Sequence, residues 1–581
     1  MIENKAIREF FDAEAEAQKA SWEATMSLPL KERIRKRKAI DNVTIDDKHF
    51  CFIDDKYLIM KVHFNHNLSD FKEGDGLFLH ENGDALGMEC TLYKYEGENT
   101  AYISVYLYRL MVDLEYVLDK TLVLDKNNVD LRENVFNNFT FSLPSEDTFW
   151  NDLLFNSHKA PVFGDVEEAE YIVDKLEKEL DVKLTPNQRE AVLNSIAAND
   201  YYLIQGPPGT GKSFVLALII LAEVMFRKRK VVVVGPNHMA VNNVLIQTAK
   251  MRAFDNLFKV GQSYHAPHFT KIIDGQEYHI PNEEHPKVSD INSREGGCLV
   301  GMTPHSLYTS RARDLEFDTL IIDEAGQMSI PLAMMGMVKG KKVIMAGDHK
   351  QLAPIMGSDD VPECLRQSAF EALLQPGNYT LLNRSFRMCA PICDFVSELF
   401  YDGKVEPASQ GCGDRVMCND KLYSFDAPIV LHDVDDGGLQ ASEVEAEAAA
   451  AIVAEYIGKG LEAKDVAVIA PFRAQVAAVR RAIRKLESID EADKLQVAVD
   501  TVDKMQGQER EVIIYSMTAG DAEYAMEMAD FLYNPNKLNV AFSRAKSKLI
   551  ILANVKRMQE LDTDNYRHIS RMLSSQRVTR V

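Results

Sequence analysis

The residues of this chain with the clearest chemistry form a glycine-rich loop. Residues 206–213 (GPPGTGKS) match the pattern G-x-x-x-x-G-K-[ST]. Glycines allow backbone N–H groups to close around phosphate oxygens, and a helix that begins there adds positive partial charge. Lys212 would reach the β- and γ-phosphates of a nucleoside triphosphate, and Ser213 would bind Mg²⁺. The predicted cofactor-binding residues of this loop are Gly206, Pro207, Pro208, Gly209, Thr210, Gly211, Lys212 and Ser213.

The flanks of the loop supply the context that such a motif requires. Residues 201–204 (YYLI) are typical of a short buried strand, and residues 214–226 are typical of an apolar helix. A chance glycine turn is the alternative interpretation, but the order of strand, glycine turn and helix disfavours it. We therefore predict that this segment binds a nucleotide.

Two later segments could complete a hydrolytic site. Residues 319–327 (TLIIDEAGQ) form an apolar strand that ends in two carboxylates. Phosphoryl transfer to water needs one carboxylate near Mg²⁺ and one that polarises the water, so Asp323 is the candidate metal ligand and Glu324 the candidate base. An acidic turn at a strand end is the alternative. In residues 347–354 (GDHKQLAP), Gln351 could contact the γ-phosphate or its water.

The elements that position these residues alternate between strand and helix from about Leu184 onward. Continuous apolar runs such as residues 231–234 and 342–346 suit a parallel sheet that is buried on both faces. A second series of such strands begins near Tyr379. We therefore predict two α/β layers in tandem, with a hinge at residues 376–377 (PG).

The N-terminal part has a different texture. Residues 1–42 are rich in helix formers, and Pro29 is expected to divide them into two helices. Short β-rich runs separated by turn signals follow from Val43 to about Asn138. This pattern predicts a small antiparallel barrel or sheet.

Length, composition and charge limit the class of protein. The chain has 581 residues, of which 46% are hydrophobic and 27% charged, so we expect a soluble protein of three or four domains. No apolar run is long enough to cross a membrane, and the first residues lack a signal core, so we expect a cytoplasmic protein without a membrane partner. The net charge of −22 argues against diffuse attraction to nucleic acid, although a local basic groove is compatible with it.

Basic clusters and cysteines carry weaker signals. Residues 31–38, 227–230 and 480–485 are basic, and solvated helix ends would explain them equally well; the first also resembles a nuclear-import signal. The eight cysteines show no disulfide framework. Four of the cysteines suggest a metal or iron–sulfur site, but they include no C-x₂-C pair, so we do not predict such a site. These four are Cys389, Cys393, Cys412 and Cys418.

The phosphate loop and the two acidic and glutamine segments occur in the same order in superfamily 1 helicases. The C-terminal half resembles the up-frameshift (nonsense-decay) and immunoglobulin mu-binding-protein-like branch of that superfamily. Together the matching segments run from about residue 184 to residue 553. The additional segments that resemble motifs of this branch are residues 184–188 (LTPNQ), 381–388 (LLNRSFRM), 470–475 (APFRAQ), 501–509 (TVDKMQGQE) and 539–546 (NVAFSRAK).

The resemblance implies further residues in an ATP site. Gln188 would hydrogen-bond adenine through its amide, and Phe386 would stack on the adenine ring. Arg387 and Arg544 would reach the γ-phosphate from the second domain, as arginine fingers do. The cysteines at 389 and 393 then fall in the helix that follows Arg387. The remaining implied contacts are Gly507 to the phosphates and Glu509 to the ribose.

The resemblance also implies that a single strand of DNA or RNA is bound, largely through its backbone and with little sequence preference. The sequence differs from the usual motifs of the branch at several positions. Residues 237–238 (NH) replace the usual Ser-Asn, residues 384–385 (RS) replace an expected Gln, and Ala353 stands where Pro is common. The residues that match strand-contact positions are Pro236, Asn237, His238, Thr303, Pro304 and Thr501.

The resulting prediction is an α/β protein with two tandem RecA-like P-loop NTPase domains, an N-terminal helical stalk and a small β-barrel. The expected domains are residues 1–42 (stalk), 43–150 (barrel), 151–376 (first motor domain) and 377–581 (second motor domain). The resemblance implies a monomeric ATP-dependent 5′–3′ helicase or translocase that uses ATP and Mg²⁺.

Two other classes of ATPase share parts of this sequence pattern. A ring-forming ATPase that remodels proteins takes its arginine finger from a neighbouring subunit, whereas Arg544 lies on the same chain. An ATP-gated clamp that does not unwind nucleic acid would share the whole ATP site, so this alternative stays open. Protein partners are not indicated.

Overall fold

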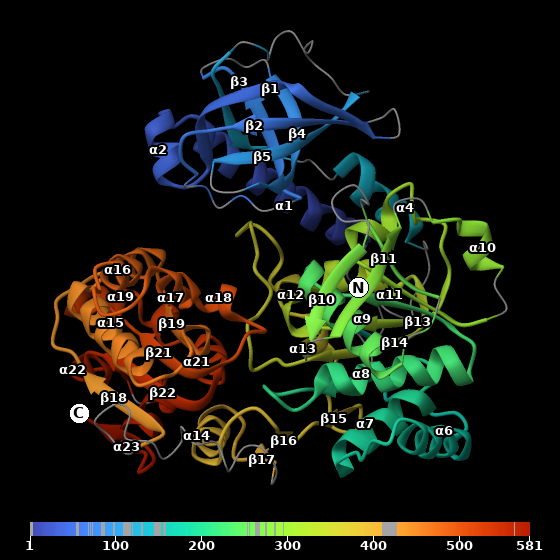
Figure 1. Ribbon diagram of the computed structural model, residues 1–581. Coiled ribbons are helices and arrows are strands. Elements are labelled where there is room, and N and C mark those ends of the chain that lie inside the picture. The colour runs from blue at the N-terminus through green and yellow to red at the C-terminus, as the bar shows by residue number, and fades with distance from the viewer. Residues whose placement is uncertain are drawn as a thin grey trace.

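The computed structural model contains two mainly parallel sheets, with a separate barrel above them (Figure 1). It describes residues 4–581 apart from residues 54–56, 68, 70, 72–73, 83–86, 97–98, 108–117, 119, 129–131, 144–152, 155–158, 253, 255, 262–267, 274–275, 284–285, 294–295, 409–426 and 563.

The first sheet has nine strands in the order β10-β11-β9-β12-β8-β13-β14-β7-β15. Its central strands are parallel, and every residue of several of them is buried, as continuous apolar runs require. The strands are β7 (Tyr201–Gln205), β8 (Lys230–Val234), β9 (Leu257–Val260), β10 (His268–Ile273), β11 (Gln276–Glu283), β12 (Cys298–Met302), β13 (Phe317–Ile322), β14 (Gly340–Gly347) and β15 (Tyr379–Leu381).

Helices cover both faces of this sheet. On one face lie α6 (Val166–Glu179), α7 (Pro186–Ala197), α8 (Lys212–Leu221) and α9 (His238–Met251). On the other lie α10 (Val288–Asn292), α11 (Ile330–Met337), α12 (Glu363–Arg366) and α13 (Ala369–Leu373). The helix expected over residues 214–226 is α-helical only as far as Leu221, and a π-helical turn continues it over Ala222–Phe226.

The second sheet has six strands in the order β20-β19-β21-β22-β18-β23, and neighbouring strands in it are parallel. Its strands are β18 (Ile429–Asp433), β19 (Val466–Ala470), β20 (Ala498–Thr501), β21 (Arg510–Ser516), β22 (Ala545–Ala553) and β23 (Thr579–Arg580). The helices around it are α14 (Ala390–Phe400), α15 (Glu443–Gly458), α16 (Arg473–Arg484), α17 (Glu491–Gln496), α18 (Val502–Met505), α19 (Ala522–Glu527), α20 (Ala529–Leu532), α21 (Pro535–Phe542), α22 (Val555–Gln559) and α23 (Arg567–Ser574). The prediction of an α/β protein with two such layers is confirmed.

The boundary between the two layers differs from the predicted one. β15 lies beyond residue 376 but pairs with β7, so it completes the first sheet. Leu382 is also packed in the core of the first layer. The chain therefore crosses to the second layer after Leu382, through β16 (Arg384–Ser385), which pairs with β17 (Glu406–Pro407), and not at residues 376–377.

The N-terminal part consists of two helices and a closed barrel. α1 (Asn4–Met26) and α2 (Leu30–Arg35) are separated at Pro29, as expected. The barrel order is β1-β2-β5-β4-β3-β6. Its strands are β1 (Ala39–Ile53), β2 (Tyr57–His63), β3 (Gly76–His80), β4 (Gly87–Tyr95), β5 (Thr100–Tyr106) and β6 (Leu122–Lys126).

Both ends of this N-terminal part differ from the predicted limits. β1 begins at Ala39, before residue 43. After the barrel, α4 (Asn137–Ser142) packs with α1 into the core of the first layer, although it precedes residue 150. α1 also contacts a loop of the first layer, because the carboxylate of Glu14 accepts hydrogen bonds at 3.0 Å from the backbone N–H groups of Gly357 and Ser358.

Neither membrane nor metal features occur among the described residues. No helix in them is long and apolar enough to cross a bilayer, and they hold no group of three or more His, Cys, Asp or Glu side chains placed to bind a metal ion. Cys389 caps α14 and Cys393 lies inside it, both buried. Cys412 and Cys418 fall outside the described residues.

A buried carboxylate lies at the carboxyl end of β21. Glu445 of α15 is buried and accepts a hydrogen bond at 2.6 Å from the hydroxyl of Ser516 and bonds of 3.0–3.1 Å from the N–H of Thr518. Burial raises the pKa of Glu445 to about 7, although these hydrogen bonds oppose the shift. Because the pKa is higher in the folded chain than in the unfolded one, the resulting stabilisation is lost as the pH rises through about 7.

We predict that Glu445→Gln becomes more stable relative to the wild type as the pH rises from 5 to 8. The glutamine stays neutral, whereas the wild type must ionise a buried group, so the difference should grow by about 1–3 kcal/mol. Thermal unfolding of both proteins across this range measures it. The exposed Glu443 of the same helix is the matched control, and Glu443→Gln should show a difference that is independent of pH. A constant difference for Glu445→Gln would contradict the assignment.

Candidate nucleotide-binding and catalytic site

The phosphate loop connects β7 to α8 as the sequence predicts. Gly209 and Gly211 have φ values of 75° and 84°, in the left-handed region that favours glycine, and Gly211 is the N-cap of α8. The hydroxyl of Thr210 donates a hydrogen bond to the carbonyl of Pro207 at 2.8 Å. The loop therefore turns directly into the N-terminus of α8, where the partial positive charge of a helix favours an anion.

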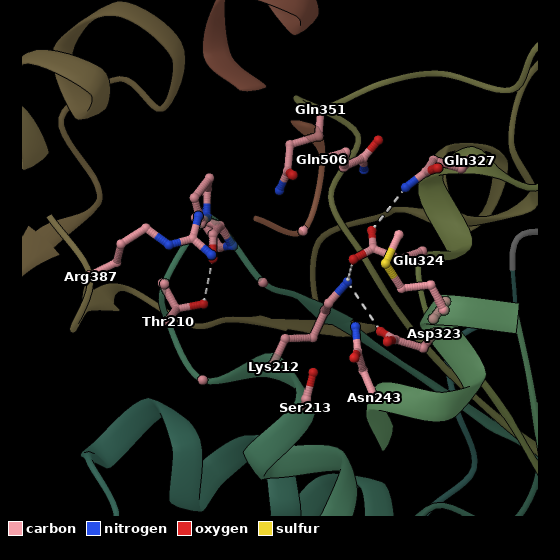
Figure 2. Close-up of a pocket in the computed structure, with 18 of the residues that line it drawn as sticks. Thr210, Lys212, Ser213, Asn243, Asp323, Glu324, Gln327, Gln351, Arg387 and Gln506 are labelled. Atoms are coloured by element: carbon pink, nitrogen blue, oxygen red, sulfur yellow. Dashed lines mark hydrogen bonds and ion pairs between the residues drawn. The ribbon is translucent and has the colours of Figure 1, made fainter. Parts of the chain in front are cut away.

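Lys212 lies between the two carboxylates that follow β13. Its Nζ is 3.1 Å from Oδ1 of Asp323 and 2.6 Å from Oε1 of Glu324 (Figure 2). Glu324 has a φ of 55°, and its second oxygen accepts a hydrogen bond from the side chain of Gln327 at 3.1 Å. A turn with left-handed geometry directly after the strand thus presents both carboxylates to the loop.

Burial and charge act in opposite directions on this group. Burial raises the pKa of Asp323 despite the nearby Lys212. Burial also acts to raise the pKa of Glu324, but the charge and hydrogen bond of Lys212, together with Arg544 and Gln327, outweigh it and lower that pKa. The pKa of Lys212 is raised, because the two carboxylates outweigh the effect of burial. Glu324 is thus the better ionised of the two and suits the role of base. A buried carboxylate and the hydroxyl of Ser213 are hard oxygen donors, which fit Mg²⁺.

Two arginines reach the same cavity from the second layer. The Nε of Arg387 is 2.6 Å from Oε2 of Glu509, and its Nη1 donates to the carbonyl of Ser543 at 3.1 Å. Arg544 is buried, and its Nε donates to the carbonyl of Val540 at 2.8 Å. Burial, together with the neighbouring Arg387, lowers the pKa of Arg544 to about 9. It remains a cation at neutral pH.

The loop and the second layer are in direct contact. The N–H of Phe386 donates to the carbonyl of Gly209 at 2.8 Å, and the hydroxyl of Ser385 donates to the carbonyl of Pro208 at 2.9 Å. A Cβ on Gly209 would collide with the side chain of Arg387. Gly209 is therefore required both for its φ and for this close approach.

One cavity of about 380 Å³ gathers most of the predicted catalytic residues. The sequence-predicted residues that line it are Gly206, Pro207, Pro208, Gly209, Thr210, Gly211, Lys212, Ser213, Asn237, Asp323, Glu324, Gln351, Arg387, Gly507 and Arg544. Residues 211 and 507, which come from different layers, thus face one space. The arrangement can surround a triphosphate with cations from both sides and present a carboxylate to water.

Three predicted nucleotide contacts are placed differently. The amide of Gln188 is used within the chain, since its oxygen accepts from the N–H of Thr185 at 3.1 Å and its nitrogen donates to the carbonyl of Thr210 at 3.1 Å. Phe386 is 43% exposed and does not line the cavity. Glu509 is paired with Arg387, which lowers the pKa of Glu509 to about 2 against the effect of burial. Their adenine and ribose roles stay predictions.

Polar residues that the sequence reasoning missed also line the cavity. Asn243 and Gln247 lie one turn apart on α9, and Asp503 and Gln506 lie at α18. The two on α9 could have been found from their spacing of four residues, which places both on one side of the helix. Gln327, which orients Glu324, lies in the acidic segment itself.

The predicted strand contacts lie at the carboxyl ends of strands. Asn237 follows β8 and caps α9, where its side chain accepts from the N–H of Ala240 at 3.0 Å. Thr303 follows β12 and its hydroxyl is 2.8 Å from that of Ser306. Thr501 ends β20 and is 9% exposed. Pro236, His238 and Pro304 adjoin these positions. Strand binding by these six residues stays a prediction.

We predict that Lys212→Ala abolishes ATP turnover, with a loss of at least about 100-fold. The substitution removes the cation expected to bind the γ-phosphate and leaves two buried carboxylates without this partner. A steady-state ATPase assay measures the effect, and Lys178→Ala, on the outer face of α6, is the control. Turnover within twofold of the wild type would contradict the assignment of the loop.

Two protein-family models match the two layers. Both are described as AAA domains; one matches residues 183–290 and 299–359, and the other matches residues 365–556. The matches cover both sheets apart from the edge strand β23, and they do not include the barrel.

Curated relatives match about two thirds of the chain. The DNA replication ATP-dependent helicase/nuclease DNA2 of Saccharomyces cerevisiae is 28% identical over 69% of this chain and 27% of its own length. The DNA polymerase alpha-associated DNA helicase A of Schizosaccharomyces pombe is 28% identical over 64% of this chain and 63% of its own. The ATP-dependent helicase NAM7 of Saccharomyces cerevisiae is 28% identical, with coverages of 64% and 42%. The chain thus spans less than two thirds of the length of each of these relatives.

Proposed function

We propose a strand motor driven by ATP hydrolysis for this chain, which belongs to the up-frameshift-like branch of the superfamily 1 helicases. One observation carries the proposal: a single cavity is lined by Lys212 and Glu324 of the first layer and by Arg387 and Arg544 of the second. A γ-phosphate there would contact cations on both layers. Its binding would therefore draw the two layers together, and its release would let them separate.

The roles of the chain's own residues in hydrolysis follow from their positions. Lys212 would leave the two carboxylates to bind the β- and γ-phosphates. Glu324, then free of Lys212, would accept a proton from the attacking water, with Gln327 holding its second oxygen. Arg387 and Arg544 would stabilise the charge that develops on the transferred group. Ser213 and Asp323 would hold Mg²⁺, which would supply positive charge beside the phosphates.

Repeated closing and opening of the cavity between the two layers would move the protein along a single strand. Both layers carry predicted strand contacts at the carboxyl ends of their sheets, Asn237 and Thr303 in the first and Thr501 in the second. If each layer binds the strand backbone in turn, closing and opening would shift the protein stepwise. We further propose two RecA-like motor domains, a helical stalk, 5′–3′ movement and action as a monomer on DNA or RNA.

We predict that single-stranded nucleic acid raises the ATPase rate by at least about tenfold, because strand binding and cleft closure favour the same arrangement of the layers. ATP turnover is measured with and without DNA and RNA oligonucleotides of mixed sequence, and duplex DNA is the comparison. A rate unchanged by every strand would refute the motor. Duplexes with a 5′ or a 3′ overhang then report unwinding and direction; stimulation without unwinding would identify a clamp.

We predict that Arg544→Ala reduces turnover by about 100- to 1,000-fold while ATP binding changes by less than about threefold, as expected of a group that acts in the transition state. Equilibrium binding of a fluorescent ATP analogue and the ATPase rate are measured on the same preparation. Arg571→Ala, at a distant surface, is the control. Equal losses in binding and turnover, with a lower unfolding temperature, would show that Arg544 only supports the fold.

A further inference from the structure

Asp348 is a buried carboxylate whose two oxygens are fully engaged. Its Oδ1 accepts from the side chain of Gln205 at 3.3 Å and from the N–H of Lys350 at 3.1 Å. Its Oδ2 accepts from the side-chain nitrogen of Gln351 at 2.8 Å and from the hydroxyl of Tyr401 at 2.6 Å. Three of these donors belong to the first layer. Tyr401, at the end of α14, belongs to the second.

The second layer holds the same loop at additional points. The side-chain nitrogen of Asn539 donates both to the hydroxyl of Tyr401 and to the carbonyl of Lys350, each at 2.7 Å. Asn536, on the same helix α21, donates to the carbonyl of His349 at 3.2 Å. The loop that carries Gln351 is thus bonded to α14, which follows Arg387, and to α21, which precedes Arg544.

We propose that Tyr401 is a positioning residue that sets the orientation of Gln351 according to the separation of the two layers. The proposal rests on the proposed function, in which the layers move. Gln351 and Tyr401 share Oδ2 of Asp348, so a displacement of the second layer changes the bond that Gln351 makes. When its nitrogen is bonded to a carboxylate, an amide offers its oxygen as an acceptor, and that oxygen can orient an attacking water in the cavity.

The chemistry of the pair supports this role. Burial, followed by the charge of Asp348, raises the pKa of Tyr401 well above its usual value, so the hydroxyl remains a donor throughout the neutral range. Bonds to a charged acceptor are also shorter and stronger than those between neutral groups. Asn539, which donates to the same hydroxyl, leaves Tyr401 only Asp348 as its acceptor among the described contacts.

Tyr401→Phe tests the proposal, since it removes the hydroxyl and keeps the buried ring. We expect kcat for ATP to fall about tenfold or more, and the KM for ATP to stay within about twofold. Tyr202→Phe is the matched control, because the Tyr202 hydroxyl also accepts from an asparagine, Asn194 at 2.9 Å, but lies wholly within the first layer. Tyr202→Phe should lower thermal stability about as much as Tyr401→Phe does, but should retain the wild-type kcat. A similar fall of kcat in both variants would overturn the proposal.

A double-mutant cycle separates positioning from support of the fold. If Tyr401 acts through Gln351, Tyr401→Phe should slow the wild type but add less than about twofold to the loss caused by Gln351→Ala. Multiplicative losses would overturn the proposal. The measured quantity in this cycle is the rate of ATP turnover, both with and without a single strand, so the result does not require strand stimulation. Failure of the proposed function would appear in the unmutated chain as an absence of strand stimulation.

Discussion

Charge balance around the nucleotide cavity is the constraint on which the rest of the site depends. Two carboxylates are buried beside the phosphate loop, and the chain neutralises them with a cation of its own. Lys212 does so in the first layer, at 2.6 and 3.1 Å, and Arg387 is likewise held by Glu509 in the second. Because unpaired buried charges are costly, each layer pairs its own ions.

Under the proposed function, a triphosphate would therefore exchange ion-pair partners in this cavity. Its oxygens would compete with Glu324 for Lys212 and with Glu509 for Arg387. Glu324, once released from Lys212, would be available to accept a proton, which would tie the state of the base to the presence of phosphate.

Much of this could be predicted from the sequence, where the signal is local. The phosphate loop, Asp323, Glu324 and Gln351 each follow a continuous apolar strand, and parallel strands bring their carboxyl ends to one edge. The three-residue strand β15 was misplaced because its pairing with β7 is set by a partner far away in the chain. The dual role of Gln188 in capping α7 and holding Thr210, and the bond between Asp348 and Tyr401, 53 residues apart in the sequence, are also non-local. The hydrophobic periodicity of the sequence does not predict such contacts.

The contact between Glu14 and the loop at Gly357 and Ser358 has a consequence for how this chain can diverge. Surface loops usually tolerate insertions and deletions. Here the second layer holds the segment at residues 348–350, and α1 holds it at residues 357–358. Its length is therefore fixed from both ends, and a single added or lost residue would break one of the two attachments. We expect length variation among relatives to concentrate elsewhere, as at the β10–β11 hairpin on the sheet edge.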